Sequence, residues 1–181
     1  LSAIRTALQS DKSTCLDQEQ RAFYERWKAV LDKAYIHAHN TPSSFSERGI
    51  LECFFDELYL RASVDYELQA GNSMAVRLVN EFAEEHVCCN RGVNGIEGSL
   101  STAAGMSVVS ERIVFCVIGD LSFFYDQNAL WNGNLKGNLR VLLLNNGHGG
   151  IFDRLPHLDE SAAKEPYIIG VHHTFAQGIC M

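Results

Sequence analysis

The sequence lacks the features of several large protein classes. Its 181 residues contain no cluster of Lys and Arg and carry a formal net charge of -7, whereas a nucleic-acid-binding surface needs a basic footprint. No apolar run approaches the roughly 20 residues of a membrane span, and no signal-peptide pattern opens the chain. We therefore expect a cytoplasmic protein that binds no nucleic acid and has no membrane span.

The cysteines also lack the spacing of a metal or disulfide framework. No CxxC motif occurs, and most of the six cysteines lie in apolar runs. This pattern favours reduced core thiols over a zinc site or disulfide bonds. Cys88 and Cys89 are adjacent and should point to opposite faces of a strand, which disfavours a bond between them. The full set is Cys15, Cys53, Cys88, Cys89, Cys116 and Cys180.

The composition and length of the chain are typical of one globular domain. The chain is 46% hydrophobic and 20% charged, and its length is sufficient for a domain with its own core. Residues 17–39 have apolar positions at helical spacing, and we assign residues 1–42 to the helical tail of a preceding domain or to a linker. The main domain would occupy residues 43–181. Because the chain stops at "TFAQGICM", within an expected helix, we expect this domain to be truncated at its C-terminus.

The main domain alternates between helix and strand patterns. Its first helix would begin with a capping box formed by Ser44 and Glu47, and its apolar face would comprise Leu51, Phe54, Phe55 and Leu58. Further helices are expected at 71–86, 98–109 and 125–132, and strands at 64–68, 87–89, 113–118 and 140–144. Such alternation predicts βαβ units, and nearly unbroken apolar strands are typical of parallel sheets covered on both faces. The predicted fold class is α/β, a three-layer α/β/α arrangement with a mainly parallel sheet.

Polar and glycine-rich segments follow the expected strands. The stretch "IVFCVIGDLSFF" ends an apolar strand at Asp120, and Asn146 follows the next strand 26 positions later, about one βαβ unit. In open parallel sheets, ligands bind at the carboxyl ends of the strands. A carboxylate, an amide oxygen and a nearby backbone carbonyl suit Mg²⁺, which completes its shell with water and phosphate oxygens. Taken singly, Asp120 is better explained as a helix cap, and residues 145–147 as a turn. The pair at this spacing, each following an apolar strand, is much more specific.

These motifs resemble those of a known enzyme family. "GDLS" followed by "NN" after a strand resembles the magnesium–diphosphate motif of thiamine-diphosphate enzymes, except that Leu121 stands where glycine is usual. That departure, together with "NSMAVR", "NRGVNGIEGSLSTAAG", "GDLSFFYDQNAL" and "LLLNNGHGGIF", closely resembles the 2-succinyl-5-enolpyruvyl-6-hydroxy-3-cyclohexene-1-carboxylate synthases of menaquinone biosynthesis. The resemblance runs from about Ser43 to Phe152, and more loosely to the end. It implies the carboxyl-terminal, diphosphate-binding domain of that family.

The resemblance implies a set of cofactor-binding residues. Thiamine diphosphate would be held with Mg²⁺ or Mn²⁺, whose protein ligands would be the side chains of Asp120 and Asn146 and the backbone carbonyl of His148. Ile96 would support the bent form of the cofactor, and the Gly95 carbonyl would meet its amino group. The family usually has glycine where this chain has His148, and a left-handed backbone there would cost His more than Gly. The His148 ring is either a donor near the diphosphate or an exposed turn side chain. The implied cofactor-binding set is Gly95, Ile96, Gly119, Asp120, Leu121, Ser122, Asn146 and Ile151.

The resemblance also implies the substrates. Ser73, Arg77, Arg91 and Phe152 match substrate-contacting positions. Both family substrates, 2-oxoglutarate and isochorismate, are dicarboxylates, and guanidinium groups bind carboxylates in a bidentate way. The implied reaction is decarboxylation of 2-oxoglutarate and addition of the resulting succinyl-semialdehyde carbanion to isochorismate.

One part of the family's machinery has no match in this sequence. In the family, a glutamate that activates the cofactor comes from the pyrimidine-binding domain of another subunit, so the implied full-length protein is a homodimer or tetramer. Glu97 and Glu111 are candidates for that role by residue type alone. We therefore expect the 181-residue chain by itself to be inactive.

Three other assignments stay open at this stage. The first is another thiamine-diphosphate enzyme, such as a 2-oxoacid decarboxylase or an acetolactate-type synthase. The second is a non-catalytic module that kept the cofactor-binding fold. The third, a nucleotide-binding Rossmann domain, is disfavoured because no GxGxxG follows the first expected strand. His172 and His173 lack partner ligands at a suitable spacing, so we interpret them as part of a loop.

Overall fold

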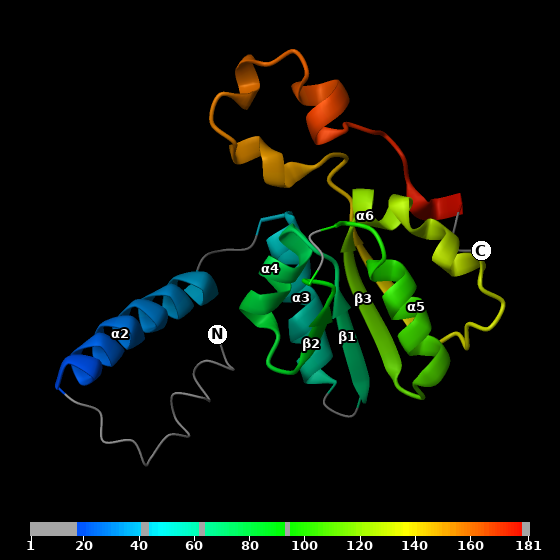
Figure 1. The fold of residues 1–181 in the computed structure, drawn as a ribbon. Helices are drawn as coiled ribbons and strands as arrows, with labels where there is room; N and C mark the ends of the chain where they lie inside the picture. Colours follow the sequence, from blue (N-terminus) through cyan, green and yellow to red (C-terminus); the bar gives the residue numbers. More distant parts are fainter. Residues whose placement is uncertain (1–17, 41–43, 62–63, 93–94, 179–181) are drawn as a thin grey trace.

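Four parallel strands form the centre of the domain (Figure 1). The computed structural model describes residues 18–40, 44–61, 64–92 and 95–178. The strands are β1 (Tyr66–Ala70), β2 (Val87–Cys89), β3 (Ile113–Gly119) and β4 (Leu139–Leu144), in the spatial order β2-β1-β3-β4. Each neighbouring pair is parallel. The expected α/β fold with a parallel sheet is therefore confirmed.

Helices cover both faces of the sheet. Successive residues of a strand point to opposite faces, and in β3 Val117 packs in a core with α3 (Glu47–Leu60) and α4 (Met74–Phe82). Cys116 and Ile118 pack instead in a second core with α5 (Ser99–Val109) and α6 (Asp120–Tyr125). The two cores, one on each face, confirm the three-layer arrangement.

The first helix of the domain begins differently from the prediction. The expected capping box of Ser44 and Glu47 is wrong, because Ser46 is the N-cap and its Oγ accepts a hydrogen bond from the backbone N–H of Gly49, at 3.1 Å. Glu47 is the first residue of α3, and its side chain accepts a hydrogen bond from Asn146 rather than capping the helix. The apolar face is as expected, with Leu51, Phe55 and Leu58 buried and Phe54 packed against them.

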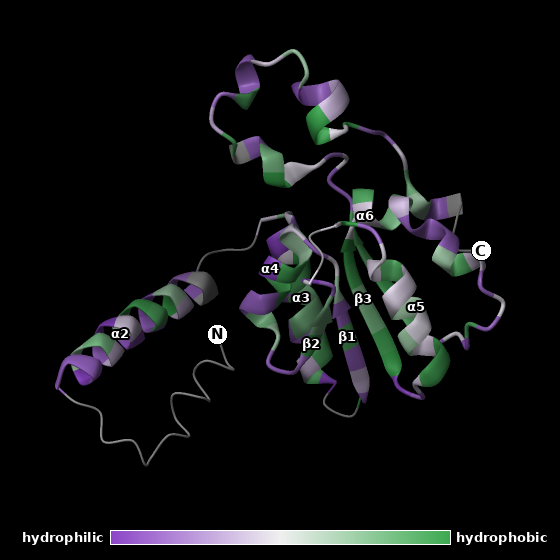
Figure 2. Cartoon of the chain, viewed as in Figure 1, coloured by the Kyte–Doolittle hydropathy of each residue, from purple (hydrophilic) through white to green (hydrophobic). Residues whose placement is uncertain are grey.

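Other element boundaries also differ from the prediction, and the helix expected at 71–86 is shorter, Met74–Phe82. β1 begins at Tyr66 rather than at residue 64, and Figure 2 shows hydrophilic residues in its first half, in contrast to the hydrophobic β3. The helix expected at 125–132 is instead α6, which starts directly at Asp120, followed by the 3-10 helix η1 (Gln127–Trp131). Asp126 separates the two, and its carboxylate accepts hydrogen bonds from the backbone N–H and Oγ of Ser101 at the start of α5.

The segments outside the sheet are less regular. α2 (Gln18–Asn40) agrees with the expected helix and leaves Phe23, Trp27 and Val30 largely exposed. After β4 the chain runs through short turns of helix: η2 (Gly150–Arg154), η3 (Leu158–Glu160), the π-helix η4 (Lys164–Ile169) and η5 (Ala176–Gly178). The helix expected at the end of the chain is described only as η5, since residues 179–181 lie outside the described residues.

The described cysteines are reduced, but most are not in the core. Cys53, Cys88, Cys89 and Cys116 are free thiols, and Cys116 alone among these four is buried. The expectation of core thiols is wrong for Cys53, which is exposed on α3. Cys15 and Cys180 lie outside the described residues. In the part of the chain that the structure describes, no helix has both the length and the apolar character needed to cross a bilayer.

Candidate functional site

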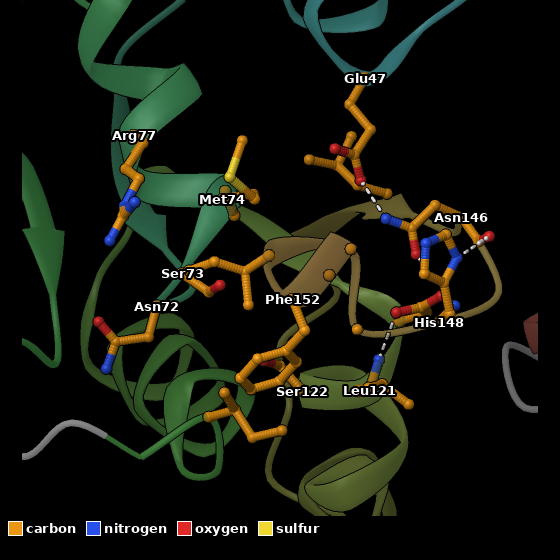
Figure 3. A pocket seen from close by; sticks show the side chains of 18 of the residues that line it. Glu47, Asn72, Ser73, Met74, Arg77, Leu121, Ser122, Asn146, His148 and Phe152 are labelled. Atoms are coloured by element: carbon orange, nitrogen blue, oxygen red, sulfur yellow. Dashed lines mark hydrogen bonds between the residues drawn. The ribbon is translucent and has the colours of Figure 1, made fainter. Parts of the chain in front are cut away.

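A pocket of about 570 Å³ lies at the carboxyl ends of β1, β3 and β4 (Figure 3). In the strand order β2-β1-β3-β4, the chain moves from β1 toward one edge of the sheet to form β2. From β3 it moves toward the other edge to form β4, so the direction reverses between β1 and β3. In open α/β sheets, such a switch point is where ligands bind, because the two connecting loops diverge and leave a crevice. The strand order therefore explains the position of the pocket.

The pocket brings together residues that are far apart in the sequence. Every residue assigned to cofactor, metal or substrate lines it except Gly95, whose carbonyl oxygen accepts a hydrogen bond from Asn72 Nδ2, at 2.7 Å. The lining members of that set are Ser73, Arg77, Arg91, Ile96, Gly119, Asp120, Leu121, Ser122, Asn146, His148, Ile151 and Phe152. Glu97 and Glu111 are not among the lining residues, and Glu111 pairs with Lys136.

Asp120 is a buried carboxylate with three donors from the chain. It is 3% exposed. Oδ1 accepts a hydrogen bond from the backbone N–H of Leu121, at 2.7 Å, while Oδ2 accepts one from the backbone N–H of Gly147, also at 2.7 Å, and faces His172 Nε2 at 3.2 Å. A carboxylate oxygen has two lone-pair sites, so Oδ1 retains one for a cation or a ligand donor.

Asn146 is held by Glu47, the side chain that was expected to form part of a helix cap. Its Nδ2 donates to Glu47 Oε1 at 3.0 Å, and its Oδ1 accepts from the backbone N–H of His148 at 3.1 Å. A carboxylate accepts but cannot donate, so Glu47 orients the amide with Oδ1 turned away from it. Burial raises the pKa of Glu47, and the negative charge of Asp120 adds to the shift.

The His148 backbone is not left-handed. The positive φ in this loop, 81°, belongs to Gly147, which removes the backbone cost anticipated for histidine at position 148. The His148 ring contacts Asp153 Oδ2 through Nε2 at 2.7 Å and the Asn146 carbonyl through Nδ1 at 3.0 Å. The hydrogen bond to Asp153 raises the pKa of His148. The ring is thus engaged by its own loop.

The opposite side of the pocket carries the arginines. Figure 3 shows Arg77, Ser73 and Asn72 on one side of Phe152, and Glu47, Asn146 and His148 on the other. Arg77 is exposed, and it has no hydrogen-bonding or ionic partner among the residues that the structure describes. Arg91 donates through Nη1 to Asn72 Oδ1 at 3.2 Å. A guanidinium without a partner at a pocket wall is available to an anionic ligand.

Ser73 has a strained backbone. It is the N-cap of α4 with φ 70° and ψ -126°, and its side chain makes no capping hydrogen bond. A non-glycine residue in this region costs about 1–3 kcal/mol and is found mainly where function requires it. In this conformation the Ser73 side chain lines the pocket and does not cap the helix end.

Asn72 was missed by the sequence analysis. It is 6% exposed, and its Nδ2 donates to the carbonyl oxygens of Asn90, at 3.0 Å, and Gly95. Together with its bond from Arg91, Asn72 ties the end of β1 to the loop that carries Ile96. Glu47, Met74 and His172 were missed as well. Asn72 and Met74 lie in the quoted segment "NSMAVR", from which only Ser73 and Arg77 were assigned a role. Nothing in the local sequence distinguishes Glu47 or His172 from an ordinary cap or loop position.

The oxygen atoms of the site suit a hard cation. Asp120 and Asn146 provide oxygen atoms, which suit Mg²⁺. An ideal Cβ added to Gly119 would meet nothing within 4 Å, so this glycine leaves pocket space that a side chain would fill. Within the described ranges no cluster of three or more His, Cys, Asp or Glu could hold a metal ion. The predicted metal ligands are of another kind, since they combine one carboxylate, one side-chain amide and one backbone carbonyl.

Comparison with known proteins identifies close relatives over part of the chain. No family model matches the chain. It is 54% identical over 114 residues to a 2-succinyl-5-enolpyruvyl-6-hydroxy-3-cyclohexene-1-carboxylate synthase of Bacteroides thetaiotaomicron, a match covering 61% of this chain and 20% of the relative. The synthase of the same name from Christiangramia forsetii is 44% identical over 127 residues, covering 68% of this chain and 22% of the relative. The one from Desulfotalea psychrophila is 46% identical over 105 residues, covering 56% of this chain and 20% of the relative.

These matches confirm the resemblance indicated by the sequence motifs. The matched segment spans about a fifth of the length of the curated relatives, so it represents one part of what those synthases contain.

Proposed function

We propose that this chain is the diphosphate-binding part of a thiamine-diphosphate-dependent 2-succinyl-5-enolpyruvyl-6-hydroxy-3-cyclohexene-1-carboxylate synthase of menaquinone biosynthesis. The observation that carries the proposal is the convergence of the residues implied by the resemblance in one pocket at the β1/β3 switch point. The identity to synthases of this name, between 44% and 54% in the relatives described above, supports it.

The cofactor end of the pocket would be formed by the loops after β3 and β4. Asp120, Asn146 and the His148 carbonyl would hold Mg²⁺, and Gly119, Leu121 and Ser122 would line the diphosphate. Ile96 and Gly95 would position the cofactor's ring system, and Ile151 would lie beside it. When bound, thiamine diphosphate supplies the electron sink for decarboxylation of a 2-oxoacid. The chain's own contribution is to position and orient it.

The substrate end would be formed by Ser73, Arg77, Arg91 and Phe152. 2-Oxoglutarate and isochorismate are dicarboxylates. The Arg77 guanidinium, which has no partner among the described residues, suits a carboxylate. Arg91 keeps part of its donor set for a substrate, because only Nη1 is bound to Asn72. Orienting both acids in one pocket converts their encounter into an effectively intramolecular step.

The rest of the machinery would come from outside the described domain. Residues 43–181 would form the diphosphate-binding domain and residues 1–42 a helical tail or linker. The activating glutamate would come from the pyrimidine-binding domain of another subunit, in a dimer or tetramer of the full-length protein. The 181-residue chain alone would then turn over no substrate.

The test follows substrate consumption by the full-length protein with Mg²⁺ and thiamine diphosphate. We expect 2-oxoglutarate to be consumed only when isochorismate is present, and pyruvate not to be consumed. Arg77→Ala should raise the KM for 2-oxoglutarate. Consumption of pyruvate instead would assign the protein to another thiamine-diphosphate reaction, and turnover by the isolated 181-residue chain would contradict the need for the partner domain.

A further inference from the structure

We propose that His172 is a positioning residue for Asp120, and that it sets the affinity of the site for Mg²⁺. This inference rests on the proposed function, because it concerns the metal that Asp120 would hold. The sequence places His172 in an unremarkable loop, 52 positions after Asp120. The fold brings His172 Nε2 to 3.2 Å from Asp120 Oδ2, with both side chains largely buried.

The hydrogen bonds of the ring identify its tautomer. The backbone N–H of Thr174 donates to His172 Nδ1, at 3.1 Å, so Nδ1 carries a lone pair rather than a proton. In a neutral imidazole the proton then lies on Nε2. His172 therefore donates to Asp120 Oδ2, and the pair is a directed hydrogen bond rather than a chance contact.

This bond distinguishes the two oxygens of Asp120. Oδ2 receives two donors, the Gly147 N–H and His172 Nε2, whereas Oδ1 receives one, the Leu121 N–H. With Oδ2 fully occupied, the carboxylate cannot rotate without losing hydrogen bonds in a buried place. Oδ1 is thereby left as the oxygen that faces a cation. Hydrogen bonds that fix a metal-binding carboxylate typically change metal affinity by about 10–100-fold when removed.

The backbone holds His172 in place independently of its ring. His172 N–H donates to the Gly147 carbonyl at 2.9 Å, and Gly149 N–H donates to the Ile169 carbonyl at 2.5 Å. Asn145 Nδ2 donates to the Thr174 carbonyl at 3.1 Å. The segment 169–174 thus lies along the loop that presents Asn146, so exchanging the His172 side chain should leave the loop where it is.

The ring has a second contact that must be separated from the hydrogen bond. His172 packs edge-on against Phe124, with ring centroids 5.4 Å apart. His172→Phe keeps an aromatic ring for this contact but removes the donor. His172→Gln removes the ring, but its amide N–H₂ can reach the position of Nε2. The two variants therefore isolate packing from hydrogen bonding.

The experiment is a calorimetric titration of Mg²⁺ into the full-length protein with saturating thiamine diphosphate. We expect His172→Phe to weaken Mg²⁺ binding by about 10–100-fold, and His172→Gln to stay within about threefold of wild type. His173→Ala, at the exposed neighbouring position, is the matched control and should bind as wild type. Circular dichroism and the melting temperature of each variant report whether the fold is intact.

The outcomes separate this inference from the proposed function. Equal Mg²⁺ affinity of His172→Phe and wild type would overturn the role of His172 while leaving the proposed function in place. The reverse order, with His172→Gln weak and His172→Phe strong, would overturn it too, because packing would then be responsible. Failure of the wild-type protein to bind Mg²⁺ with thiamine diphosphate would overturn both.

Discussion

At the scale of single residues, the site depends on oxygen atoms that the fold keeps in fixed orientations. Asp120 is buried yet receives three hydrogen bonds, from Leu121, Gly147 and His172. A buried carboxylate without such donors would be costly. The sequence motif indicated that Asp120 stands at the end of a strand, but it could not indicate which groups would surround it, because two of the three donors lie far along the chain.

A side chain added at Gly119 should block the cofactor without unfolding the domain. Gly119 has φ -74° and ψ 160°, which any residue can adopt, and an added Cβ would meet nothing within 4 Å. The Gly119→Val side chain would therefore occupy space in the pocket without clashing with the rest of the domain. Crowding of this kind costs about 1–3 kcal/mol, so we expect the affinity for thiamine diphosphate to fall by roughly 10–100-fold.

Gly133→Val is the control for that substitution. Gly133 is exposed, away from the pocket lining, and also has open space around an added Cβ. Calorimetric titration with thiamine diphosphate should distinguish the two variants, while their melting temperatures stay close to wild type. Unchanged affinity in Gly119→Val would show that the diphosphate lies elsewhere.

The free thiols should differ sharply in reactivity. Burial raises the pKa of Cys116 to about 12, so its reactive thiolate is scarce at pH 8 in the folded protein. Cys53 is exposed. We expect N-ethylmaleimide at pH 8 to modify Cys53 within minutes and to leave Cys116 unmodified until denaturant is added, as read by peptide mass spectrometry. Equal labelling of the two in the native protein would contradict the described core.

At the scale of elements, the sequence predicted best where the apolar run is nearly unbroken. β2, β3 and β4 have such runs, and they match the expected strands to within a residue. β1 was misplaced by two residues, since Glu67 and Gln69 interrupt its hydrophobic pattern. Gln69 is nevertheless fully buried, with its Nε2 donating to Asn90 Oδ1 at 3.3 Å. Such a buried polar partner is a tertiary contact that a local pattern does not contain.

The start of α3 gives a direct test of cap assignment. Ser46→Ala removes the hydrogen bond that Ser46 Oγ accepts from Gly49, and loss of an N-cap costs about 1 kcal/mol. We expect Ser46→Ala to lower the free energy of unfolding by that amount in urea denaturation. Ser44→Ala, the position predicted by the capping-box pattern, should be close to neutral. A larger loss in Ser44→Ala than in Ser46→Ala would restore the capping box.

At the scale of the whole molecule, the strand order assembles the site. The sequence placed polar segments after the expected strands, at the sheet edge where ligands bind. In the fold, β3 and β4 are neighbours, but β1 lies between β2 and β3, so the end of β1 supplies Asn72 and Ser73 to one side of the pocket. The hydrogen bond from Asn146 to Glu47 joins residues 99 positions apart. Contacts of that range follow from topology, which is why Glu47 and His172 escaped sequence analysis.

The proposed function requires this pocket to bind thiamine diphosphate through a metal ion held by Asp120. The most direct measurement is calorimetric titration of thiamine diphosphate into the full-length protein, with and without Mg²⁺, for wild type and Asp120→Ala. We predict binding to the wild type that requires Mg²⁺ and is lost in a folded Asp120→Ala variant. Binding that persists without the metal ion, or that is equally tight in Asp120→Ala, would contradict the claim.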